Sequence, residues 1–102
     1  MAVDDVALAL IDLHDPDIRS RVAQGDLSDL PGGLTDEETE MLVTAAGDDP
    51  EVEGFSVTES EFYVPLTYVA NNRRNISPDV RSQFNNFFSL RWGGAWSIPL
   101  MG

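Results

Sequence analysis

The only histidine of the chain, His14, lies close to two aspartates, Asp12 and Asp15. A histidine beside carboxylates could act as a general base or contribute to a metal site. Both chemistries need further groups nearby, and the sequence has neither a second histidine nor any cysteine. We therefore interpret His14 as a partly exposed residue at a helix end, and we expect no catalytic residue, no metal site and no cofactor.

Two short runs of carboxylates, at residues 36–38 and 48–49, could offer oxygen ligands to a calcium ion. The spacing of a calcium-binding loop, in which acidic residues alternate with others before a glycine, is absent from both runs. Acidic residues are also common in the first turn of a helix, where they face the positive end of its dipole. We therefore interpret these carboxylates as a solvated helix start rather than as a calcium site.

A pair of glycines, Gly32 and Gly33, follows Val22, Leu27 and Leu30 at the spacing found in double-glycine leader peptides. In such leaders an amphipathic helix fills a groove of an export peptidase, and the two glycines fit a narrow cleft. Cleavage at this pair is one hypothesis. A flexible link between two helices is the other.

The charge of the chain is divided unevenly along its 102 residues. Residues 1–62 carry 17 of the 18 acidic residues and only two arginines, whereas residues 63–102 have a net charge of +3. All nine aromatic residues lie between Phe55 and Trp96. The first part must therefore pack with aliphatic side chains alone, and the second part holds the large side chains that dominate cores and interfaces.

The overall charge limits the kinds of partner that the chain can bind. A net charge of −12 disfavours nucleic acid and anionic membranes, and it favours a basic protein. We expect no membrane span, because no run of about 18 apolar residues occurs. The N-terminus lacks the basic start of a secretory signal, so we expect a cytoplasmic protein, with export after processing if the chain is a precursor.

Capping residues and apolar periodicity predict several helices. Asp15 before Pro16 suits a helix start, because an aspartate can cap and a proline fits the first helical position. Thr35 and Glu38 have the spacing of a capping box. The predicted helices cover residues 3–15, 16–24, 35–47 and 78–90.

Short strands or extended segments are predicted over residues 55–70. Pro65 would restrict a strand here to a sheet edge or a bulge. The prediction depends on the alternation of apolar side chains at Phe62, Val64, Leu66 and Tyr68.

The sequence thus predicts an α+β fold made of two unlike parts. Residues 1–54 form a small acidic helical module. Residues 55–102 form an aromatic-rich region with short strands, one C-terminal helix and an irregular apolar tail that begins at Arg91.

One stretch of the first part, DPDIRSRVAQGDL…GLTDEETEMLVTAAGDDPEVEGF (residues 15–55), resembles a known small helical domain. This domain is shared by the small subunit of extradiol ring-opening dioxygenases and by leader regions of ribosomally synthesised, post-translationally modified peptides, including borosin precursors. The resemblance implies an acidic helical leader that binds a maturation enzyme and a C-terminal core that receives the modification. It also implies that the catalytic residues belong to the partner.

The first functional hypothesis is therefore a non-catalytic precursor or carrier peptide, whose acidic half binds a larger maturation enzyme. The side chains predicted to bind the partner are Leu10, Ile18, Val22, Leu27, Leu30, Met41, Leu42, Phe84, Phe87 and Phe88. The tail residues predicted to be modified or inserted are Trp92, Trp96, Ser97, Ile98, Pro99 and Leu100.

The second hypothesis is a small non-catalytic subunit whose apolar tail inserts into a larger protein and completes its fold or site. A third is a self-contained α+β domain whose tail packs on its own sheet and needs no partner. The first two hypotheses require the apolar tail to be covered by a partner, because an exposed apolar segment promotes aggregation.

Overall fold

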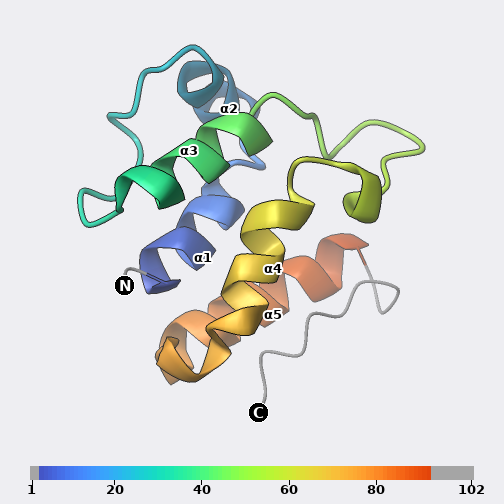
Figure 1. Cartoon of the computed structure of the whole chain (residues 1–102). Helices are drawn as coiled ribbons and strands as arrows, with labels where there is room; N and C mark the ends of the chain where they lie inside the picture. Colours follow the sequence, from blue (N-terminus) through green and yellow to red (C-terminus); the bar gives the residue numbers. More distant parts are fainter. Residues whose placement is uncertain (1–2, 93–102) are drawn as a thin grey trace.

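The computed structural model describes the backbone of residues 3–92 and the side chains of residues 3–88. In this part of the chain, helix α1 lies at the centre, where it contacts α3, α4 and α5 (Figure 1). Helix α2 packs on α3, and α3 packs on α4. The α-helices are α1 (Val3–Asp12), α2 (Pro16–Ala23), α3 (Asp36–Ala45), α4 (Tyr63–Asn71) and α5 (Pro78–Trp92), and the 3-10 helices are η1 (Val57–Glu59) and η2 (Arg73–Asn75).

Helix α1 is central because its side chains are small and apolar on most of its surface. A helix that is apolar nearly all round is buried on several sides. Its short alanine side chains let neighbouring helices approach closely, and aromatic side chains from later in the chain fill the remaining space. The buried residues of α1 are Val3, Val6, Ala7, Ala9 and Leu10.

The prediction of an α+β fold with strands over residues 55–70 is wrong. Residues 3–92 contain only helices and their connections, and the stretch with alternating apolar residues forms η1 and α4. The same stretch also has helical spacing, since the N-cap residue Phe62 and the α4 residues Leu66 and Val69 are all fully buried. Val64, which the alternation placed on the same face as Phe62 and Leu66, is 51% exposed.

Pro65 explains why this segment can be helical in spite of its proline. Pro65 is the third residue of α4, and the N–H groups of the first helical turn have no acceptor within the helix. Its missing N–H therefore removes no helical hydrogen bond, and the first i to i−4 bond of the segment runs from Leu66 N–H to the Phe62 carbonyl at 3.1 Å.

Local capping chemistry confirms two of the predicted helix starts. The Asp15 carboxylate accepts hydrogen bonds from the N–H groups of Asp17 at 2.9 Å and Ile18 at 3.4 Å. Thr35 Oγ1 accepts the Glu38 N–H at 3.1 Å, and Glu38 Oε1 accepts the Thr35 N–H at 2.9 Å, which completes the predicted capping box. Both starts rest on contacts within four residues, so the sequence alone sufficed to identify them.

Replacing Thr35 by alanine is expected to lower the free energy of unfolding by about 1 kcal/mol, because the Glu38 N–H then loses its acceptor at the helix start. Urea denaturation followed by circular dichroism measures the change. Thr44→Ala, an exposed change in the same helix, is the control and should alter stability by no more than about 0.5 kcal/mol. Equal losses in both variants would contradict the capping explanation.

Side chains also tie together helices that lie far apart in the sequence. Asp4 Oδ1 accepts the Ser77 N–H at 2.9 Å, which joins the starts of α1 and α5. Asp48 Oδ2 accepts the Glu61 N–H at 2.7 Å, which joins the segments after α3 and before α4. Helices from both sides of residue 54 therefore share one core, and the division into two parts at that residue stays a prediction.

Candidate functional site

His14 was expected to be partly exposed at a helix end, and the structure corrects this, because the residue is only 4% exposed. Its ring nitrogen Nδ1 lies 2.9 Å from the Leu10 carbonyl, which makes Nδ1 the donor. The rings of Phe62, Phe87 and Phe88 surround it, with centroids at 5.8, 4.9 and 5.2 Å. His14 therefore packs where α1, α4 and α5 meet, away from solvent-borne substrates.

The apolar residues predicted to bind a partner differ widely in exposure. Leu10, Val22, Leu42, Phe84 and Phe88 are buried within this chain. Three half-buried members pack against the same core, and they are Ile18, Leu30 and Phe87. Met41 is also half-buried. Leu27 is exposed.

The predicted cleavage site, Gly32–Gly33, is exposed in the connection between α2 and α3. A Cβ atom on Gly33 would lie 2.9 Å from Asp5 Oδ2, so this connection passes close to α1. Whether the pair is cleaved stays a prediction. The predicted tail residues Trp96, Ser97, Ile98, Pro99 and Leu100 lie outside the described residues, as does the side chain of Trp92.

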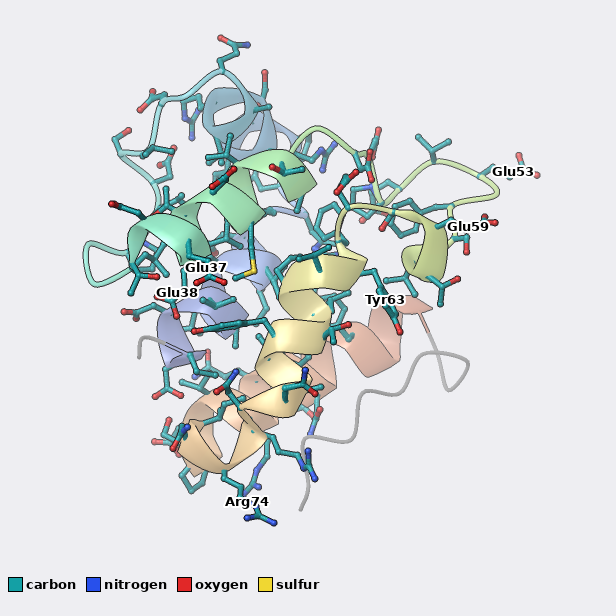
Figure 2. All side chains as sticks on the ribbon, viewed as in Figure 1. Glu37, Glu38, Glu53, Glu59, Tyr63 and Arg74 are labelled. Atoms are coloured by element: carbon teal, nitrogen blue, oxygen red, sulfur yellow. The ribbon has the colours of Figure 1, made fainter. Side chains whose placement is uncertain are left out.

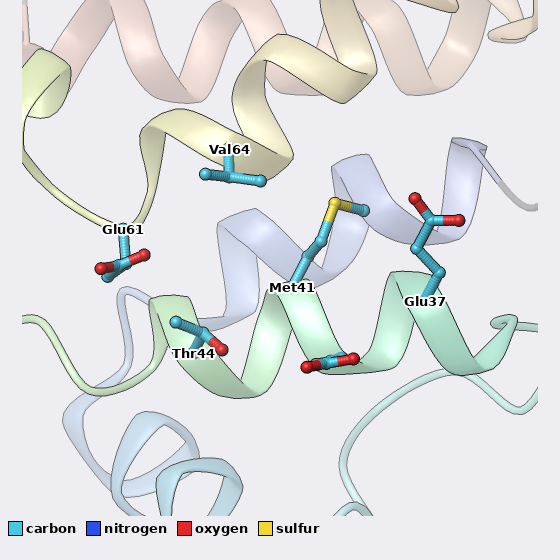
Figure 3. A pocket seen from close by; sticks show the side chains of 6 residues that line it. Glu37, Met41, Thr44, Glu61 and Val64 are labelled. Atoms are coloured by element: carbon cyan, nitrogen blue, oxygen red, sulfur yellow. The ribbon is translucent and has the colours of Figure 1, made fainter.

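A groove of about 190 Å³ lies between α3 and α4, and we call it the α3–α4 groove. Figure 3 shows Met41 of α3 and Val64 of α4 on its two sides, with Glu37 toward one end and Glu61 toward the other. Its centre is thus apolar and its ends are acidic. The lining residues are Glu37, Glu40, Met41, Thr44, Glu61 and Val64.

Of these residues, only Met41 was predicted from the sequence to bind a partner. Glu37, Glu40, Met41 and Thr44 share one face of α3, because they are spaced three or four residues apart. The opposite wall comes from Val64 of α4 and from Glu61, two residues before that helix, in the segment predicted to be extended. The groove could not be predicted once that segment was assigned to a sheet.

Beside the groove, a buried carboxylate links the two helices. Glu38 is 1% exposed, and its Oε2 accepts a hydrogen bond from the Tyr68 hydroxyl at 2.6 Å. Figure 2 shows Glu37 and Glu38 on the side of α3 that faces α4. Because the other carboxylate oxygen of Glu38 belongs to the capping box, one side chain fixes both the start of α3 and its position against α4.

The hydroxyl of Tyr68 is expected to ionise only at strongly alkaline pH. Its hydrogen bond to Glu38, then burial, then the negative charges of Glu38 and Glu37 raise the pKa of Tyr68 from 10.0 to about 12. Because the pKa of Tyr68 is higher in the folded chain than in the unfolded chain, its protonated hydroxyl stabilises the fold. This contribution is complete below pH 10.0 and is lost as the pH rises through about 12. Titration of tyrosinate absorbance in a Tyr63→Phe variant isolates Tyr68, and a midpoint near 10 would contradict the bond.

A second, more open hollow of about 340 Å³ lies over residues 48–60. Its walls include the carboxylates of Asp48, Asp49, Glu53 and Glu59. The hydrogen bond from the Glu61 N–H to Asp48 places this hollow next to the α3–α4 groove. The two neighbouring hollows are both lined by carboxylates, and we call them together the acidic side of the molecule.

The corner between α1 and α2 also holds several carboxylates, and two of the carboxylates in this part of the molecule or near it form ion pairs with arginines. Burial, followed by the negative charges of Asp29 and Asp15, raises the pKa of Asp12 above its usual value. Arg21 binds Asp29 at 2.6 Å, and Arg19 binds Asp49 at 3.2 Å.

The residues that the structure describes form neither a metal-binding cluster nor a membrane-spanning helix. No group of three or more His, Cys, Asp or Glu residues in that part of the chain could hold a metal ion. Likewise, none of the helices α1 to α5 is long and apolar enough, over its described residues, to cross a membrane.

Comparisons with known proteins found no matching family model, no matching curated protein and no matching solved structure. The resemblance of residues 15–55 to helical leader domains therefore stays a hypothesis.

Proposed function

We propose that this chain is a non-catalytic, protein-binding subunit that attaches to a larger, basic partner through its acidic side. One observation carries the proposal: the α3–α4 groove and the adjoining hollow over residues 48–60 are both lined by carboxylates, with no lysine or arginine in either lining. Each also holds an exposed valine, Val64 or Val52. Apolar centres with charged rims are typical of protein–protein interfaces.

The size and contents of the groove favour a partner side chain over a small substrate. Small-molecule sites commonly enclose about 300–1,000 Å³. The α3–α4 groove, at about 190 Å³, is smaller. The residue best suited to acid–base chemistry, His14, is packed among phenylalanine rings and does not line either hollow.

The precursor hypothesis remains the second candidate, and the exposed glycine pair favours it. It is weakened by the position of the leader-like residues, because Leu10, Val22 and Leu42 face the core of this chain. A leader offers its apolar helix face to a groove of the maturation enzyme. In this chain that face would have to leave its core before it could bind.

The test is purification of the chain from its native source at low salt, followed by intact mass measurement. We expect an unmodified chain in a stoichiometric complex with a larger protein. The complex should dissociate as the salt concentration rises from about 0.1 M to about 1 M, because exposed charge pairs are screened. An unmodified chain that elutes alone at low salt would overturn the proposal. A truncation, or a mass shift within residues 89–102, would favour the precursor hypothesis.

A further inference from the structure

We propose that the α3–α4 groove is where the partner docks, and that its occupant is a short basic segment of that partner with one apolar anchoring side chain. This inference rests on the proposed function and names the surface and the chemistry that the function uses. It depends on four properties of the groove: its apolar centre, its charge, its rigidity and its length.

The apolar centre of the groove is open to solvent. Val64 is 51% exposed, although it stands on a helix whose other apolar residues Leu66 and Val69 are fully buried. Met41 faces it from α3 and is half-buried (Figure 3). Methionine adapts to many apolar shapes, so this pair suits an inserted aliphatic side chain.

The charge of the groove selects a cationic occupant. Glu37 and Glu40 border it on α3, and Glu61 borders it before α4. The two arginines of the acidic half bind other carboxylates, because Arg19 pairs with Asp49 and Arg21 with Asp29. Neither of those carboxylates lines the groove, and no arginine belongs to its lining, so a cationic segment of the partner would complement its charge.

The walls of the groove are held in place before any partner binds. The Tyr68 hydroxyl donates to Glu38, which fixes α4 against α3 at 2.6 Å. The Asp48 carboxylate holds the Glu61 N–H at 2.7 Å, which fixes the entry into α4. A preformed site loses less conformational entropy on binding, and this favours a specific complex over a diffuse charge attraction.

The length of the groove sets the size of the occupant. Glu37 and Thr44 lie seven residues apart on α3, which corresponds to about 10 Å along a helix. Two turns of a partner helix therefore span it. Such a helix would place one leucine or isoleucine between Met41 and Val64, with a lysine or arginine one turn away on each side.

The first experiment measures binding of a fluorescein-labelled, 15-residue helical peptide that carries leucine flanked by lysines at this spacing. Fluorescence anisotropy at about 50 mM salt gives the Kd. The variant Glu37→Gln/Glu40→Gln/Glu61→Gln should weaken binding by about tenfold, because the three carboxylates that attract the lysines of the peptide are neutralised. The control Asp12→Asn/Asp17→Asn/Asp26→Asn changes the net charge equally outside the groove and should weaken binding by less than about threefold.

The second experiment tests the apolar anchor with two matched valines. Val64→Ala should weaken peptide binding by about three- to tenfold, since part of the buried apolar area is lost. Val52→Ala removes an equally exposed valine, 55% against 51%, from the neighbouring hollow. That hollow belongs to the surface proposed for the whole partner but not to the groove that this peptide is designed to fill, so the Kd of the peptide should stay unchanged. Amide chemical-shift changes should concentrate on Met41, Thr44 and Val64.

Three outcomes would overturn the groove proposal: no saturable binding, equal losses in both charge variants, or equal losses in both valine variants. Each leaves the proposed function standing if the native complex still forms. The absence of any native complex overturns the proposed function itself, whatever the peptide does.

Discussion

Replacing Phe62 by alanine is expected to lower the free energy of unfolding by about 3–5 kcal/mol. Phe62 is 0% exposed, and its ring packs against His14 at 5.8 Å and against Phe55 at 6.1 Å between centroids. Loss of the ring leaves a cavity where α1 and α4 meet, because the surrounding helices can collapse only partly. For a domain of this length, such a loss is a large share of the total stability.

Urea denaturation followed by circular dichroism measures this change. Tyr63→Ala is the matched control, because the neighbouring aromatic is 48% exposed and its removal should alter stability by no more than about 0.5 kcal/mol. A loss below about 1 kcal/mol in the Phe62 variant would show that its ring is not a core element.

The same variant tests whether residues 1–54 fold independently of residues 55–102. Phe62 belongs to the second stretch, and the His14 ring that it contacts belongs to the first. If the two stretches form one cooperative unit, amides of α1 and α4 should lose protection from hydrogen exchange to the same extent. Loss confined to α4 and α5 would instead support the two-part organisation predicted from the sequence.

The helices that could be predicted are those whose ends depend on neighbours in the chain. Asp15 before Pro16, and Thr35 three residues before Glu38, each supply a cap within one turn. The segment that forms α4 has no side-chain cap, since Phe62 stands at its N-cap position. The apolar side chains of residues 62–69 fit both the period of two of a strand and the period near four of a helix. Because no capping signal was present, only tertiary packing decided between the two structures.

The site was harder to predict than the fold, because its residues come from distant parts of the sequence. Met41 and Val64 come together only when α4 packs on α3. Glu38 likewise accepts its hydrogen bond from Tyr68, which lies thirty residues further along the chain. Glu38 was assigned from the sequence to a solvated helix start, and its burial depends on that same packing. The burial of His14 also depends on distant parts of the sequence, because its phenylalanine neighbours come from α5 and from the residue before α4.

Replacing Tyr68 by phenylalanine is expected to lower the free energy of unfolding by about 1.5–3 kcal/mol. The change keeps the ring and removes only the hydroxyl that donates to Glu38 Oε2 at 2.6 Å. A hydrogen bond to a buried charged group contributes more than a neutral one, and the carboxylate that remains is 1% exposed. Tyr63→Phe removes a hydroxyl from an exposed tyrosine of the same helix and should change stability little.

A double-mutant cycle with Glu38→Gln separates this bond from the loss of the hydroxyl alone. In the Glu38→Gln background no carboxylate is left without its donor, so Tyr68→Phe should cost less, with a coupling of about 1–2 kcal/mol between the two sites. Additivity within about 0.5 kcal/mol would mean that the two side chains do not stabilise each other. Because this bond fixes α3 against α4, the Tyr68→Phe variant should also bind the basic peptide more weakly while every groove residue is retained. A variant that is destabilised as expected but binds with unchanged affinity would show that the groove does not depend on the rigidity of its walls.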